Sequence, residues 1–122
     1  MNSPELLHSI VFSMLPEGLE SRFIIESFKK TPDEFDIILV EKNTVPDLPS
    51  EYRNKHIINN VLNPITLNDF SIRGRRCKLT IKRRYWKFDG IQEMYVYPLQ
   101  IKAEGTNLTK EFGDFLKEIN RN

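Results

Sequence analysis

A run of basic residues between Arg73 and Lys87 is the part of this sequence best suited to bind a charged ligand. Five of its eight basic residues are arginines, whose planar guanidinium matches the geometry of phosphate oxygens. Lysine alone would serve a solvated strand edge that prevents aggregation, so the residue types favour anion recognition, with nucleic acid as the ligand, over that alternative. The run contains no Asp or Glu, and its basic residues are Arg73, Arg75, Arg76, Lys78, Lys82, Arg83, Arg84 and Lys87.

This run changes the meaning of the overall charge. The chain of 122 residues has 18 basic and 17 acidic residues, and its formal charge of +1 argues against a polyanion as partner. The run carries +8, however, so the other 107 residues hold 10 basic and 17 acidic residues and sum to −7. This distribution predicts local, oriented binding of a polyanion, with the acidic remainder turned away from the phosphates.

Strand periodicity predicts where these charges point. In one strand from Arg75 to Phe88, even-numbered residues from Arg76 to Trp86 share one face, and odd-numbered residues share the other. Asp89-Gly90 is a two-residue hairpin signal. The expected cross-strand pairs are Trp86 with Glu93, Arg84 with Tyr95, and Lys82 with Tyr97. The even face thus interleaves basic and aromatic side chains, and predicts phosphate contacts flanked by Trp86, Tyr95 and Tyr97.

The length of this strand is a second indication of DNA binding. At about 3.3 Å per residue it spans roughly 45 Å, so we expect the hairpin beyond Ile81 to project from the core. Solvent on both faces of the tip would explain Arg83 and Tyr85 on the nominally buried side. A projecting two-stranded ribbon fits the DNA major groove, about 12 Å wide. The same charged arm could instead dock on an acidic protein.

The remaining elements frame this arm. Ser3 and Pro4 begin a helix that ends near Leu15, and Thr109 caps a second helix with apolar residues Phe112, Phe115, Leu116 and Ile119. Strands are expected at 22–28, 35–41, 65–70, 75–88 and 91–101, with 22–28 and 35–41 paired as an antiparallel hairpin, 35–41 central and at most one short helix near 51–58. The sequence therefore predicts one α+β domain over 1–122, with a mainly antiparallel sheet of about five strands.

Other types of site are not expected. His8 and His56 lack partners at metal-ligand spacing, Cys77 should point into the core, and acidic residues near Asp33 flank a turn. We predict no catalytic residues, no metal and no cofactor. The absence of a signal sequence, a membrane span or paired cysteines predicts a cytoplasmic protein.

The segment from Leu67 to Trp86, with Asp69-Phe70, Arg73-Gly74 and a strand ending in arginines and an aromatic residue, resembles the N-terminal region of bacterial insertion-sequence transposases. Residues 103–120 are similar to the ending of that region, and residues 15–19 and 41–43 are similar to its opening. Distant relatives carry cysteine pairs after the arginine-rich strand, where this chain has Lys87-Phe88-Asp89-Gly90.

The resemblance implies a role in transposition, a form of DNA recombination. In such families this region precedes a catalytic DDE domain, in the same chain or an adjacent reading frame, and the expected partners are DNA at transposon ends and that catalytic domain. Nothing in the sequence supplies the carboxylate triad of two-metal strand transfer. The leading expectation is a non-catalytic DNA-binding or regulatory module; the alternative is a module that docks the catalytic subunit or a second copy of itself.

Overall fold

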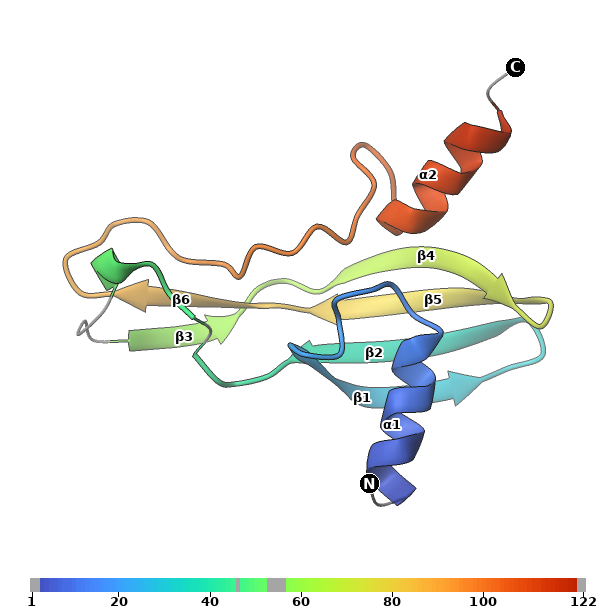
Figure 1. The fold of residues 1–122 in the computed structure, drawn as a ribbon, viewed down its shortest axis with the longest axis horizontal. Coiled ribbons are helices and arrows are strands. Elements are labelled where there is room, and N and C mark those ends of the chain that lie inside the picture. The colour runs from blue at the N-terminus through green and yellow to red at the C-terminus, as the bar shows by residue number, and fades with distance from the viewer. Residues whose placement is uncertain (1–2, 46, 53–56, 121–122) are drawn as a thin grey trace.

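The computed structural model describes residues 3–45, 47–52 and 57–120, which form an α+β fold (Figure 1). One four-stranded sheet has the order β1-β2-β5-β4, and β3 pairs with β6 in a separate two-stranded ribbon. The expected helices near both ends are present. The elements are α1 (Ser3–Ser13), β1 (Phe23–Lys30), β2 (Glu34–Glu41), the 3-10 turn η1 (Ser50–Tyr52), β3 (Ile57–Val61), β4 (Ile65–Ile72), β5 (Arg75–Lys82), β6 (Arg84–Phe88) and α2 (Lys110–Ile119).

The four-stranded sheet combines two antiparallel hairpins. β1 and β2 form the first, as predicted, and β2 is central because its other edge pairs with β5 in parallel. β4 and β5 form the second hairpin around Arg73 and Gly74, which both adopt positive φ, at 52° and 77°. Glycine adopts this left-handed conformation without steric cost.

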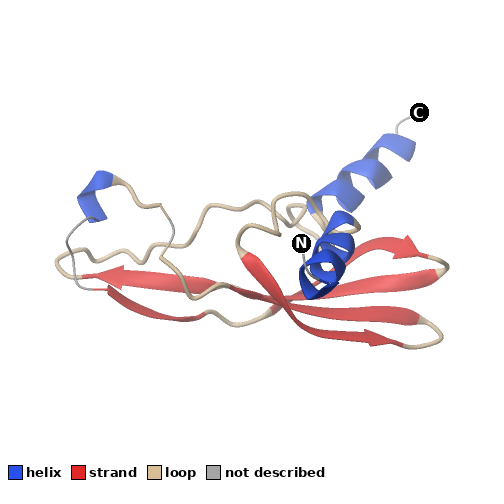
Figure 2. Cartoon of the chain, turned by 60° about the horizontal axis from the view of Figure 1, so that its bottom comes forward, coloured by secondary structure: helices blue, strands red, loops and turns tan. Residues whose placement is uncertain are grey.

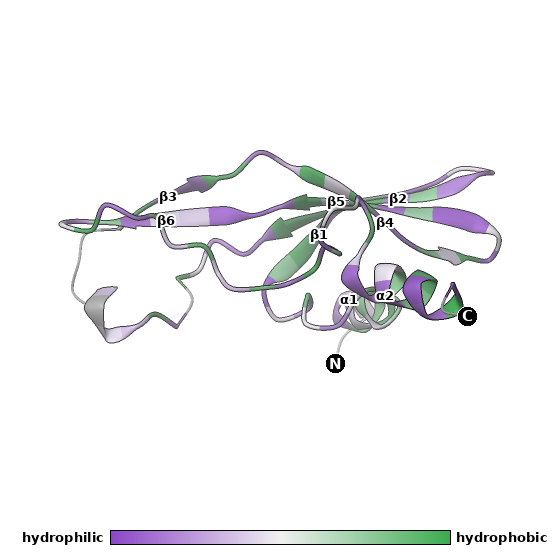
Figure 3. Cartoon of the chain, turned by 90° about the horizontal axis from the view of Figure 1, so that it is seen from above, coloured by the Kyte–Doolittle hydropathy of each residue, from purple (hydrophilic) through white to green (hydrophobic). Residues whose placement is uncertain are grey.

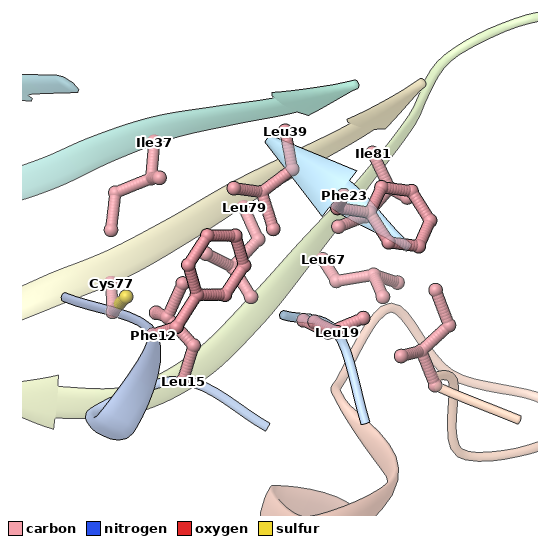
Figure 4. Close-up of a cluster of buried hydrophobic side chains, with 11 residues drawn as sticks. Phe12, Leu15, Leu19, Phe23, Ile37, Leu39, Leu67, Cys77, Leu79 and Ile81 are labelled. Atoms are coloured by element: carbon pink, nitrogen blue, oxygen red, sulfur yellow. The ribbon is translucent and has the colours of Figure 1, made fainter. Parts of the chain in front are cut away.

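The core lies on one face of this sheet, against α1 and the segment that follows it (Figure 4). Alternation in β5 turns Cys77, Leu79 and Ile81 inward, where all three are at most 1% exposed. Phe12 of α1 and Leu15, which follows the helix, belong to the same buried cluster. Most of the apolar residues of α1 do not join this core, because the helix extends past edge strand β1 (Figure 1). The large apolar residues of this segment that remain exposed are Leu6, Leu7, Ile10 and Met14.

α2 is held at the β4 edge by its cap. The predicted N-cap, Thr109, accepts a hydrogen bond from the Phe112 amide at 3.4 Å and donates one to Asp69 at 2.8 Å. A Cβ on Gly113 would lie 2.5 Å from the Ala103 Cβ, so glycine is needed where the helix meets that segment. The ring of Phe70 packs against the rings of Phe112 and Phe115.

The predicted pairing of strands 75–88 and 91–101 in one long hairpin is wrong, although a two-stranded ribbon does extend beyond the four-stranded sheet (Figure 1). The strand 75–88 is interrupted at Arg83, and β6 pairs with β3, a strand that was not expected. Gly90 makes the expected turn with φ 78°, but the segment 91–101 forms no strand. That segment meets β6 at one antiparallel bridge, Trp86 with Tyr95, instead of the expected Trp86 with Glu93. The expected short helix near 51–58 is only the 3-10 turn η1, and residues 53–56 lie outside the described residues.

Candidate nucleic-acid interface

The interruption at Arg83 changes which side chains of the basic run face solvent. Before it, odd-numbered residues such as Leu79 and Ile81 are buried; after it, even-numbered Trp86 and Phe88 are buried, at 0% and 4% exposure. The prediction of a solvent-facing Trp86 is therefore wrong. It assumed unbroken alternation, and one residue outside the ladder moves every later side chain to the opposite face.

The aromatic residues expected to flank the ligand form a second, small core on the covered side of the ribbon. Tyr52 of η1 packs against Phe88 and Tyr95, with ring centroids 4.8 and 5.5 Å apart. Both backbone hydrogen bonds between Trp86 and Tyr95 place the latter beside β6, and burial raises the pKa of the Tyr95 hydroxyl. Trp86, Tyr95 and Tyr97 thus stabilise the ribbon, and the structure does not bring them onto a free basic face.

A buried ion pair joins this small core to the four-stranded sheet. The Arg22 Nη2 donates to Glu41 Oε2 at 2.8 Å, and its guanidinium carbon lies 5.5 Å from the Trp86 ring centroid and 5.3 Å from that of Tyr97. The second carboxylate oxygen of Glu41 accepts the Arg84 backbone amide at 2.9 Å. Glu41 therefore holds the chain at the point where β5 passes into β6.

Several arginines of the run have structural partners. Arg75 donates from Nε to the Thr31 carbonyl at 2.8 Å and lies over the Phe35 ring. Arg84 donates from Nε to the Glu41 carbonyl at 3.0 Å. Arg83 donates to the Tyr97 carbonyl, and burial lowers the pKa of its guanidinium. These three arginine side chains are therefore less available to bind a ligand than the sequence alone suggests.

Four basic residues remain on the face opposite the core, and we call them the basic stripe: Arg76, Lys78, Lys82 and Lys87. Both helices and η1 lie on the same side of the strands (Figures 2 and 3), so no described helix covers the other side. We call that other side the open face. The open face continues from the four-stranded sheet onto the ribbon. Because the break at Arg83 reverses the alternation of side chains, even-numbered residues of β5 and odd-numbered residues of β6 lie on this face. Arg73, in the β4–β5 turn, is exposed beyond the end of this stripe.

The charge separation expected from the sequence is only partial. Strand pairing places Asp36 between Lys29 and Lys78, and Glu34 beside Arg76, all on the open face. Lys82 also forms an exposed ion pair with Glu26, 2.9 Å between Nζ and Oε1. The expectation that acidic residues turn away from the stripe is wrong for these three carboxylates. They come from strands distant in sequence, which a segmental charge count cannot place.

Three residues of the ribbon join the open face without having been predicted there. Pairing of Ile58 with Lys87 and of Asn60 with Tyr85 places these four side chains together. Tyr85 is half-buried, and the other three are exposed. Tyr85 is therefore the aromatic residue that accompanies the stripe. The residue types of β3 carry little strand signal, and only the break at Arg83 reveals the orientation of Tyr85.

The remaining described residues supply few other sites. Cys77 is fully buried, as predicted, and burial raises the pKa of its thiol to about 12. The described residues hold no group of three His, Cys, Asp or Glu side chains placed to bind a metal, and no described helix is long and apolar enough to cross a membrane. Comparisons with protein-family models, curated proteins and solved structures found no match to this chain.

Proposed function

We propose that this protein is a non-catalytic DNA-binding or regulatory module of an insertion-sequence transposition system, which contacts phosphates through the basic stripe. The observation that carries the proposal is the open face itself. Arg76, Lys78 and Lys87 form no salt bridge there with any other described residue, while covering elements gather on the other side. Lys and Arg side chains without a salt bridge can neutralise DNA phosphates. This releases the counterions condensed on the DNA and favours binding at low salt.

The arrangement favours an extended polyanion over a small anion. The stripe runs along β5 and β6, so its charges are distributed over the length of the molecule and do not converge in one pocket. Asp36 and Glu34 lie beside basic residues of the sheet and reduce the positive potential there. On the ribbon, Lys87 pairs with Ile58, so this strand pair contains no acidic side chain. Contact along a nucleic-acid backbone suits such a linear arrangement.

The transposition context comes from the resemblance of residues 67–86 to insertion-sequence transposases. In that context the DNA is a transposon end, and the catalytic DDE domain, in the same protein or in a second one, is the other expected partner. We assign no catalytic role to any residue of this chain, and a reducing, cytoplasmic location is consistent with its single, buried cysteine.

A titration of labelled duplex DNA at several salt concentrations tests the proposal. Four phosphate contacts would give a slope of about −3.6 in log affinity against log salt. We expect submicromolar to micromolar binding at low salt that weakens steeply as salt rises. Failure to bind any duplex at low salt would overturn the proposal.

The docking of another protein is a second candidate function, and the apolar residues of α1 favour it. Leu7 is 63% exposed and Ile10 is 49% exposed, one helical turn apart. A second copy of the chain or the catalytic subunit could bury them. Sedimentation of the purified protein, alone and with that subunit, tests this: a monomer in both samples contradicts docking, and an Ile10→Glu variant should abolish any complex.

A further inference from the structure

The open face of the ribbon has an unusual set of side chains for a solvated surface. Ile58 is 58% exposed, and beside it lie Asn60, Tyr85 and Lys87. The opposite face of the same ribbon is closed by Trp86 and its aromatic neighbours. The ribbon therefore packs through one face only. Folding alone does not require the apolar side chain of Ile58 and the amide of Asn60 on the other face.

We propose that this face of the β3–β6 ribbon enters the major groove of duplex DNA and reads A·T base pairs, with Asn60 and Ile58 as the base-contacting residues. The inference rests on the DNA-binding function proposed above, and it adds sequence readout to phosphate contact. Asparagine pairs with the N6 and N7 edge of adenine, and an apolar side chain contacts the thymine methyl group.

The dimensions and charges of the ribbon suit the major groove. Two paired strands are about 4.8 Å apart, and a two-stranded ribbon fits a groove about 12 Å wide. Tyr85 pairs with Asn60 and Lys87 pairs with Ile58, and the Nζ of Lys87 lies 5.9 Å from the Tyr85 ring centroid. An aromatic hydroxyl and a cation thus lie beside the two proposed readers and can reach phosphates at the groove edge. The described side chains of this ribbon face include no carboxylate that would repel the DNA.

The amide of Asn60 is available in this conformation. Its Oδ1 accepts the Val61 backbone amide at 2.8 Å, which orients the side chain. The oxygen has a second lone pair, and the NH₂ group has two donors for adenine. Asn59, by contrast, accepts a hydrogen bond from Arg84 Nη1 at 3.3 Å and belongs to the Trp86 face, so it is not the reader.

Major-groove reading also distinguishes DNA from duplex RNA. The major groove of A-form RNA is deep and too narrow for side chains to read. The stripe could still contact RNA phosphates, whereas Asn60 could not reach the base edges. We therefore expect sequence preference on duplex DNA and none on duplex RNA.

Selection of duplexes from a randomised DNA pool tests the inference with the intact chain. The wild type should enrich a motif that contains A·T pairs, and Asn60→Ala should lower discrimination at one position by about tenfold while it retains salt-dependent binding to all sequences. Asn107→Ala, which changes an exposed asparagine beside β4 in the segment before α2, is the matched control and should keep the motif. Emission from Trp86 reports that each variant is folded.

Each outcome decides between the two proposals. If the wild type binds DNA without enriching any motif, or if Asn60→Ala keeps the same motif, the readout inference is wrong and phosphate binding stands. The same holds if the enriched motif lacks A·T pairs. If the wild type binds no duplex at any salt concentration, both the readout and the proposed function are wrong.

Discussion

The carboxylate of Glu41 joins two parts of the molecule at once, because it binds the Arg22 guanidinium through Oε2 and the Arg84 backbone amide through Oε1. Arg22 in turn lies over the Trp86 ring. Both charged side chains are almost completely buried, with side-chain exposures of 9% for Arg22 and 1% for Glu41. Their ion pair joins the residue before β1 to the end of β2, and the hydrogen bond from the Arg84 amide to Glu41 joins the end of β2 to the start of the ribbon.

Replacement of Glu41 by alanine should therefore destabilise the fold strongly. It leaves the buried Arg22 charge without its partner, which costs about 3–5 kcal/mol of unfolding free energy. Urea denaturation measures this loss. Glu26→Ala removes the partner of Lys82 in an exposed pair and should cost at most about 1 kcal/mol. Equal losses in the two variants would show that Glu41 is not a buried link.

Trp86 and Tyr85 are neighbours with opposite predicted roles. Trp86→Ala empties the ribbon core and should lower the unfolding free energy by about 3–5 kcal/mol. Tyr85→Ala should cost much less stability and should weaken DNA binding, since Tyr85 lies on the open face. Because Trp86 is the one tryptophan of the chain, its fluorescence should resist iodide quenching and change little on addition of DNA. Strong quenching by DNA would instead indicate stacking on Trp86.

The thiol of Cys77 should be unreactive in the native protein. Burial raises its pKa to about 12, so the thiolate population at neutral pH is very small, and the side chain is 0% exposed. A chromogenic disulfide reagent at neutral pH should label it only after denaturation. Rapid labelling under native conditions would contradict both the burial of Cys77 and the finding that odd-numbered residues of β5 face the core.

Asp69 should make stability depend on pH. Burial raises its pKa above 3.8, while the hydrogen bond from Thr109 opposes the shift. The folded protein then holds the proton more tightly than the unfolded chain, so the unfolding free energy falls as pH rises from 3.8 through the raised pKa. Asp69→Asn keeps an acceptor for Thr109 and should remove this part of the slope.

Urea denaturation at a series of pH values provides the comparison. Asp114→Asn is the control, because the Lys110 hydrogen bond lowers the pKa of Asp114 and places its contribution below pH 3.8. An unchanged slope in Asp69→Asn would contradict the assignment of this pH dependence to Asp69.

Local patterns predicted the elements whose signals are regular. The β1–β2 hairpin, the central position of β2, the capped helix α2 and the inward Cys77 all follow from apolar periodicity, turn residues and capping chemistry. These signals act over a few residues, so the sequence displays them directly.

The ribbon could not be predicted in the same way. Asp89-Gly90 does mark a turn, yet the strand that pairs with β6 is β3, which contains two asparagines and comes from an earlier part of the chain. The break at Arg83 depends on Glu41, which binds the next backbone amide from another strand. Non-local contacts thus decided both the partner of β6 and the face on which Trp86 lies.

The central claim is that the open face contacts DNA, and two charge-matched double variants test it most directly. Arg76→Gln with Lys78→Gln removes two charges from the basic stripe, whereas Lys102→Gln with Lys117→Gln removes two exposed charges from the segment before α2 and from α2 itself. Duplex affinity is measured against salt concentration for both. We predict that the first variant reduces the salt slope by about 2 and weakens binding at low salt, while the second leaves both nearly unchanged. Equal effects in the two variants, or a larger effect in the second, would contradict the account.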